Sequence, residues 1–410
     1  MAADAKNTGY AAFTHRDFRF HCSARLLFGI ALSMQTVAVG WYVYGVTNSA
    51  LALGFSGLAS FLPPAVLALF AGHFADTHNR RKIVASSFAV CALGSFGLLA
   101  LVMSGSSDVR SIYACIVAVA SGRAFANPAA QALTANVVPK EHFPNAVTWY
   151  SSAWSTARII GPAVGGLLYV AGPVAPFLVA CLFFASASLC VAMVSVSVTP
   201  QGGRGPITWG ALSAGLRFIR SRQVILGAIS LDLVAVLFGG ASALLPIVAQ
   251  DILHVGPWGL GLLRSSPALG AIAMGAWLAH APIRSKAGKT MLIAVAVYGL
   301  AIVGFGLSDT LILSMLMLAM SGAADQISVV IRHTMVQSET PDEMRGRVAA
   351  VNSIFVSGSS DLGEFESGVT AWWWGTVPAI IFGGAATLGF AALWSALFPQ
   401  LRDRDQVVGK

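Results

Sequence analysis

Ionisable side chains stand inside long apolar stretches of this 410-residue chain. The acidic ones are Asp232, Asp325, Asp361 and Glu364, and the basic ones are Arg123, Arg158 and Arg264. Placing one such group in lipid costs about 2.5–3.5 kcal/mol, so each must face protein or water. A carboxylate in a cavity of low dielectric has its pKa raised towards neutrality, so it can take up a proton near neutral pH and release it again. These residues predict proton binding and release inside a membrane.

Asp232 and Glu364 are the first candidates for carrying that proton. Asp232 lies about 15 Å along its expected helix at 1.5 Å per residue, close to the bilayer midplane. Asp361 and Glu364 are three residues apart and share a helix face, whereas Glu366 points elsewhere, near the outer boundary, where plain solvation explains it equally well. Asp325, in the inner half of its span, is a further candidate.

A structural ion pair is the alternative for the two acids of the eleventh span. Arg264 lies at a similar depth and could neutralise Asp361 or Glu364. Such a pair would hold helices together without binding cargo or protons.

A polar row marks one face of the fourth apolar stretch. Arg123, Asn127 and Gln131 follow one another at steps of four, which places all three on the same side of a helix. Arg158 occupies the middle of the next stretch, beside several serines. These residues are expected to line a central cavity and to offer positive charge to an anionic or phenolate-rich substrate. Paired arginines that lock helices together are the equal alternative.

Twelve apolar stretches are long enough to cross a hydrocarbon core of about 30 Å. Only 10% of the residues are charged, against about 25% in a soluble chain. The stretches must be helices, because every peptide group in lipid needs an internal partner. Their approximate bounds are 21–46, 50–72, 83–104, 111–136, 147–170, 175–198, 223–250, 257–280, 290–307, 310–332, 347–370 and 378–399.

The chain has a net charge of +8, and the placement of its basic residues follows the expected topology. Alternate loops carry nearly all the basic residues, and the opposite set holds Arg110 alone. Basic loops stay in the cytoplasm, so both termini are expected there. The basic balance therefore indicates anionic lipid headgroups as neighbours rather than nucleic acid.

The chain repeats itself. Gly161 and Gly166 stand opposite Gly363 and Gly368 at a constant offset of 202 residues. Two related helical halves are typical of secondary transporters, whose sites lie between the repeats. We expect an N-terminal six-helix bundle over 1–198, a cytoplasmic linker with an amphipathic helix over 199–222, and a C-terminal six-helix bundle over 223–410.

Enzyme chemistry is not indicated. The five cysteines fall in apolar stretches without metal-ligand spacing, and the eight histidines are scattered. The sequence contains no Gly-rich nucleotide loop, so energy is expected from an ion gradient. We expect no metal and no cofactor.

The loop between the second and third stretches reads Gly72-His73-Phe74-Ala75-Asp76-Thr77-His78-Asn79-Arg80-Arg81. It resembles the loop signature of the major facilitator superfamily, in which Gly, Asp and two basic residues recur at this spacing. The resemblance implies a conformational latch made by Gly72, Asp76, Arg80 and Arg81. Thr77 replaces the usual Arg, and Asn79 replaces the usual Gly. Since Asn tolerates a left-handed backbone, we expect the turn to survive.

The fifth stretch contains Gly161-Pro162-Ala163-Val164-Gly165-Gly166. This segment is similar to the superfamily's antiporter motif, which implies export. Pro162 bends the helix, and Gly161, Gly165 and Gly166 allow a neighbouring helix to approach, which would seal the two halves against ion leak. Plain helix packing without a role in direction is the alternative.

A narrower resemblance covers about residues 15 to 400. Val138-Pro139-Lys140-Glu141 and Thr340-Pro341-Asp342-Glu343 are similar to segments of the enterobactin-exporter-like branch, which includes drug-efflux relatives. The resemblance implies an all-α integral membrane protein, with twelve transmembrane helices in two pseudo-symmetric six-helix bundles, in the bacterial inner membrane.

The expected function is proton-coupled export of a small amphiphilic molecule, a siderophore or a drug, by alternating access. An importer of the same fold is the first alternative, and the Gly-Pro motif argues against it. A non-transporting sensor or scaffold is the second, and the polar row argues against that. We expect a monomer whose partners are the cargo, protons and the lipid bilayer, with no nucleic acid.

Overall fold

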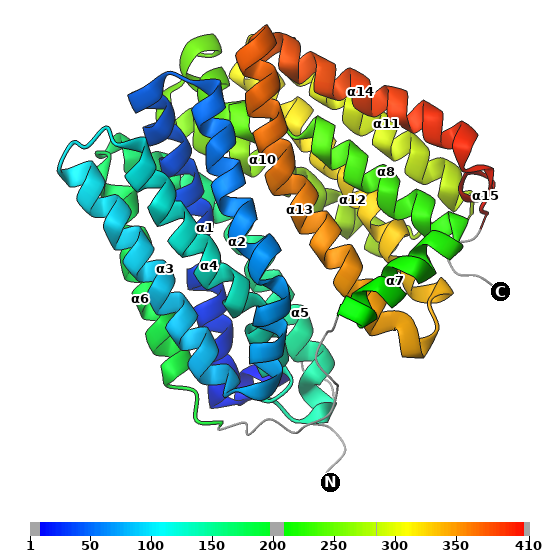
Figure 1. Cartoon of the computed structure of the whole chain (residues 1–410), viewed down its shortest axis with the longest axis horizontal. Coiled ribbons are helices and arrows are strands. Elements are labelled where there is room, and N and C mark those ends of the chain that lie inside the picture. Colours follow the sequence, from blue (N-terminus) through cyan, green and yellow to red (C-terminus); the bar gives the residue numbers. More distant parts are fainter. Residues whose placement is uncertain (1–8, 197–208, 284, 406–410) are drawn as a thin grey trace. The chain divides into compact units, whose positions relative to one another are not determined.

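The computed structural model describes residues 9–196, 209–283 and 285–405 and contains no strands among them. Its membrane-crossing helices are α1 (Arg16–Thr47), α2 (Ala50–Thr77), α3 (Arg80–Met103), α4 (Val109–Thr134), α5 (Phe143–Val170), α6 (Val174–Ala192), α8 (Gln223–Gly239), α10 (Gly256–His280), α11 (Ala287–Gly306), α12 (Leu311–Glu339), α13 (Asp342–Trp374) and α14 (Thr376–Leu397). Each of these helices overlaps one of the twelve predicted stretches. Figure 1 shows their arrangement.

Within the described ranges, nine of these segments are both long and apolar enough to cross a membrane. The other three are α5, α10 and α13, which reach 28, 25 and 33 residues. They carry four of the seven charged residues that the sequence placed inside the membrane, namely Arg158, Arg264, Asp361 and Glu364. Their lower hydropathy is therefore expected of helices that face protein or water rather than lipid.

The seventh span is not one continuous helix. α8 ends at Gly239, and a 3-10 turn η3 (Ala241–Leu244), the short α9 (Leu245–Ile247) and a π-helical turn η4 (Val248–Ile252) complete the span. Non-helical backbone at this depth must find hydrogen-bond partners within the protein. The expectation of one uniform helix over 223–250 was wrong.

The chain divides into two compact units. One comprises Met1–Tyr42 and Leu62–Pro206, and the other comprises Val43–Phe61 and Ile207–Lys410. The second unit thus includes the end of α1 and the first part of α2. The predicted bundles, 1–198 and 223–410, were drawn by continuous sequence, and that division stays a prediction.

The two units repeat the same helix pairing. In the first, α3 packs against α4 and α6, and α5 packs against α6. In the second, α11 packs against α12 and α14, and α13 packs against α14 (Figure 1). Counted from the start of each half, the third helix contacts the fourth and sixth, and the fifth contacts the sixth. The internal repeat in the sequence therefore has a structural counterpart.

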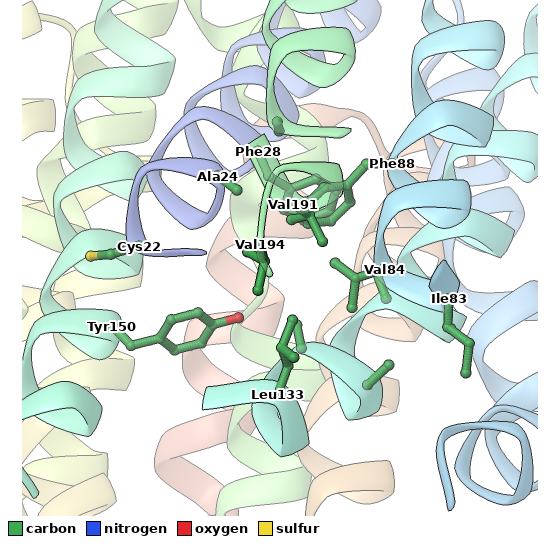
Figure 2. Packing of buried hydrophobic residues seen from close by; sticks show 14 of the residues in the cluster. Cys22, Ala24, Phe28, Ile83, Val84, Phe88, Leu133, Tyr150, Val191 and Val194 are labelled. Atoms are coloured by element: carbon green, nitrogen blue, oxygen red, sulfur yellow. The ribbon is translucent and has the colours of Figure 1, made fainter. Parts of the chain in front are cut away.

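Aromatic rings join three helices in the core of the first unit. Phe28 of α1 stacks on Phe88 of α3 with ring centroids 4.4 Å apart, and Phe184 of α6 lies 5.5 Å from Phe28. All three side chains are buried. Figure 2 shows Phe28 and Phe88 beside Val191. Buried aromatic pairs of this kind fix the spacing of α1, α3 and α6.

The predicted linker helix is present as α7 (Trp209–Ser221), and positions 199–208 of the linker lie outside the described residues. Ile219 is buried, and Gly215 lies against the backbone of Arg347 in α13. Arg217 and Arg220 are exposed on the other side. The helix is therefore amphipathic, as the spacing predicted, although Leu216 is exposed rather than buried.

Asp405, near the C-terminus, caps the start of α11. The backbone N–H of Lys286 donates to Oδ1 of Asp405 at 3.0 Å, and the N–H of Ala287 donates to the carbonyl of Asp405 at 3.1 Å. These bonds satisfy donors that a helix start leaves unpaired.

We expect Asp405→Ala to lower the free energy of unfolding by about 0.5–2 kcal/mol, the usual effect of removing a capping carboxylate. Chemical unfolding in mixed micelles measures this. Asp403→Ala is the control, because its exposed pair with Arg402 lies outside the cap. An equal loss in both variants would contradict the capping role.

Candidate functional site

A buried ion pair joins α8 and α12 in the second unit. Arg332 Nη2 lies 3.1 Å from Asp232 Oδ2, and the two side chains are only 2% and 4% exposed. Arg332 Nη1 also donates to Oδ1 of Asn352 on α13 at 3.0 Å. Burying both charges is costly, so the contact is stable only because each group has its partner. Asp232, the first proton candidate, therefore sits in a network that spans three helices.

Arg332 and Asn352 were missed by the sequence reading. The tenth stretch was expected to end at residue 332, whereas α12 continues to Glu339. The signal was available: Pro341 restricts Thr340 to extended backbone, and no breaker precedes it. A helix extended to that point places Arg332 two turns inside its end.

Two further groups act on Asp232. Asp325, at the midpoint of α12, and Tyr298, on α11, interact with it electrostatically. Asp325 was expected in the inner half of its span, and the longer helix explains the difference. The Tyr298 hydroxyl donates to the carbonyl of Gly239 at 3.0 Å, where α8 ends. Asp232 is thus linked to the break in α8.

Side chains from other helices complete the hydrogen bonding at that break. Ser367 of α13 donates to the carbonyl of Gly240 at 2.8 Å. Arg264 of α10 donates from Nη1 to the carbonyl of Ser242 at 3.4 Å. Interrupted helices whose free carbonyls meet polar side chains are typical of transporter binding sites.

Arg264 also pairs with Glu364. Arg264 Nη2 lies 3.2 Å from Glu364 Oε1, and the side chains are 18% and 22% exposed. The ion pair expected from their similar depth is therefore present. Because both side chains are partly exposed, solvent can reach this pair. Asp361 lies one turn earlier on α13, and Gly57 of α2 packs between the two acids, against the Asp361 carbonyl and the Glu364 Cβ.

The polar row of the first unit lies on α4 as predicted. Asn127 and Gln131 are exposed, and Arg123 is partly buried. On the adjoining α5, Arg158 is exposed together with Ser151. Exposed polar groups at this depth require water rather than lipid around them. Their role in lining a substrate cavity stays a prediction.

The loop with the latch signature is held by its two arginines. Arg80 donates to the Ala75 carbonyl at 3.2 Å and to Asn136 at 2.9 Å, and Arg81 donates to the Val194 carbonyl at 2.6 Å. Gly72 and Asp76 are both partly buried at the end of α2.

The reason given for Asn79 was wrong. Its φ of −63° is not left-handed, and its side chain instead caps α3 by accepting from the N–H of Lys82 at 3.2 Å. Asn is a favoured capping residue, so the loop tolerates it where Gly is usual.

The Gly-Pro segment of α5 packs against α1. A Cβ at Gly161 would lie 2.6 Å from the Cβ of Ser33, and one at Gly165 would lie 2.8 Å from the Met34 carbonyl oxygen. Pro162 and Gly166 are buried beside them. The close approach was predicted, and the neighbouring helix belongs to the same unit. Sealing against ion leak stays a prediction.

The second unit repeats this contact. A Cβ at Gly363 of α13 would lie 2.8 Å from the carbonyl oxygen of Leu237 in α8. Gly363 corresponds to Gly161 in the repeat, and α8 begins the second half as α1 begins the first. The two halves therefore have a glycine at the equivalent position, and in each half it lets the fifth helix approach the first.

No group of three or more His, Cys, Asp or Glu residues in the described chain could hold a metal ion. The five cysteines are free. The polar groups of this site are acids, arginines, hydroxyls and amides, which suit proton and anion binding better than metal binding.

Twelve membrane-crossing helices, a repeated helix pairing and charged groups inside the spans together define a transporter of the major facilitator superfamily. The chain belongs to the superfamily's transmembrane secretion effector family, which it matches over residues 7–408. The resemblance drawn from the loop motifs is confirmed, and the chain is a transporter rather than an enzyme.

Its curated relatives include the enterobactin exporters EntS of Citrobacter koseri and Escherichia coli O81, each 27% identical over 341 residues, 82% of this chain and 80% of theirs. A bacterial homolog of the human lysosomal transporter Spinster, inward-facing and occupied, shares its fold with a TM-score of 0.74, 15% identity, and coverage of 97% of this chain and 99% of that one. The structure of the nucleoside transporter NupG (D323A mutant) is similar with a TM-score of 0.72 and 14% sequence identity. The match covers 93% of this chain and 100% of that one.

Proposed function

We propose that this protein is a proton-driven exporter of a small amphiphilic anion, working by alternating access in the bacterial inner membrane. The buried pair of Asp232 and Arg332 carries the proposal. A carboxylate that already holds a cation can exchange that cation for a proton when water reaches it. The exchange frees Arg332 and alters the contact between α8 and α12.

Proton binding changes the charge of Asp232, and this change couples the proton to the movement of cargo. With Asp232 ionised, Arg332 is neutralised and α8 is held to α12 and, through Asn352, to α13. Protonation of Asp232 removes this attraction and lets the helices rearrange. Glu364 and Arg264 form the more exposed second pair, beside the break in α8, where a proton can enter first. Asp361 and Asp325 lie next to these pairs and tune their charge.

The polar faces of α4 and α5 suit the cargo. Arg123, Asn127, Gln131 and Arg158 offer positive charge and hydrogen-bond donors to an anionic or phenolate-bearing molecule. Two features favour export over import: the named activity of the curated relatives and the Gly-Pro segment of α5. We further propose that the protein acts as a monomer with both termini in the cytoplasm.

Purified protein in lipid vesicles with an imposed pH gradient tests the proposal. Iron-chelating compounds and amphiphilic dyes are screened as cargo, and a protonophore should abolish accumulation. Glu364→Gln should slow gradient-driven transport about tenfold, the factor for about 1.4 kcal/mol lost with one charge-assisted bond. Glu366→Gln, two residues along the same helix, is the matched control. Transport that ignores the gradient would contradict proton coupling.

A further inference from the structure

Arg25 of α1 is a partly buried cation of a different kind. Its guanidinium carbon lies 4.1 Å from the ring centre of Trp154 and 4.9 Å from that of Tyr150, both on α5. Among the described residues it makes neither a hydrogen bond nor an ion pair, and its Nε is buried without a partner. By contrast, Arg264 and Arg332 each face a carboxylate.

The aromatic rings offset part of the cost of partly burying this charge, and the buried Nε remains without a hydrogen-bond partner. A cation over an aromatic face gains about 0.5–2 kcal/mol. That contact uses the face of the guanidinium and leaves its in-plane N–H donors available, and these fit a carboxylate or phenolate well. An anion would therefore complete the environment of Arg25.

Other neighbours of Tyr150 hold its ring in place. His21, one turn before Arg25, stacks on it with centroids 4.8 Å apart and an angle of 12°. His21 is itself fixed by a 3.0 Å hydrogen bond between Nε2 and the hydroxyl of Thr134 on α4. Figure 2 shows the hydroxyl end of Tyr150 directed toward Leu133 and Val194. The aromatic wall is therefore rigid before any ligand binds.

The face of α5 that carries Trp154 also carries exposed polar residues. Ser151, Trp154, Ser155 and Arg158 follow the spacing of one helix face, so Trp154 belongs to the same row as its polar neighbours. The two serines and Arg158 are exposed, and Trp154 is partly buried. A ligand on this face would meet the hydroxyls and the exposed part of the Trp154 ring, against which Arg25 stacks.

We propose that Arg25, Trp154 and the hydroxyls of α5 bind an aromatic anion, with the carboxylate or phenolate on Arg25 and the ring beside Trp154. This rests on the proposed function and deepens it, because it names planar aromatic anions as the cargo class. Indole and phenol walls favour such a ring over a bare phosphate, which would be better served by hydrated lysines or a helix start.

Salicylate and its neutral isostere salicylamide test the site. Binding of each to the purified protein in nanodiscs is measured by calorimetry, without any gradient. Wild type should prefer salicylate. Arg25→Gln should weaken salicylate about tenfold, the factor for about 1.4 kcal/mol from one lost charge-assisted contact, and salicylamide less than about twofold. Arg110→Gln, which removes an exposed arginine of α4, is the matched control and should change neither.

Equal salicylate binding by wild type and Arg25→Gln, or no salicylate binding by wild type, would overturn the proposal. If Arg25→Gln fails to fold, Arg25→Lys keeps the charge but loses the planar fork, and it should still weaken salicylate. An unchanged affinity there would show that Arg25 only locks α1 to α5. Because binding needs no gradient, this result is separate from the vesicle assay, so either proposal can fail alone.

Discussion

Replacing Arg332 with methionine should lower the free energy of unfolding by about 3–5 kcal/mol, because it leaves the Asp232 carboxylate buried without its cation. Asn352 would lose its donor as well. Chemical unfolding in mixed micelles gives the value directly. Arg264→Met is the matched control, since its pair with Glu364 is partly exposed and its loss should cost no more than about 1 kcal/mol.

The double variant Asp232→Asn with Arg332→Met separates stability from coupling. Removing both charges of a buried pair is often neutral or stabilising, so most of the lost stability should return. Gradient-driven transport should not return, because the proton site is gone. A stable double variant that still couples cargo to the pH gradient would exclude Asp232 as the proton carrier and leave its pair with Arg332 a structural contact.

The positions of the helices could be predicted because apolar length and breakers decide them locally. Thr47-Asn48-Ser49 separates the first two spans in sequence, and α1 ends at Thr47 in the structure. The break in α8 could not be predicted. Gly239 and Gly240 stand in an apolar run, and the groups that satisfy their carbonyls, Tyr298 and Ser367, come from distant parts of the chain.

The candidate site also contains residues that could be predicted from the sequence and residues that could not. Glu364 and Arg264 were paired correctly, because counting residues along two helices gives their depth in the membrane. Arg332 was missed because its depth depends on where α12 ends. Arg25 lay inside the first predicted span, yet its partners are ring faces on α5, and aromatic residues in a membrane helix are too common to indicate such a contact.

Adding one methyl group to the repeated glycine should have the same effect in both halves. Gly161→Ala and Gly363→Ala should each lower the free energy of unfolding by about 1–3 kcal/mol, because the new Cβ meets α1 or α8 at 3 Å or less. Gly389→Ala in α14 is the control of opposite sign. A Cβ there meets nothing within 4 Å, so the helix should gain about 0.5–1 kcal/mol.

A measurement of proton leak tests whether the contact made by these glycines does more than pack two helices together. If the Gly-Pro segment seals the transporter, Gly161→Ala vesicles without cargo should lose an imposed pH gradient faster than wild type, per folded molecule. Gly363→Ala, at the equivalent position, should leak similarly, and Gly389→Ala should not. A normal gradient lifetime in both destabilised variants would show that these glycines only let helices approach, and the argument from this motif to export would then fall.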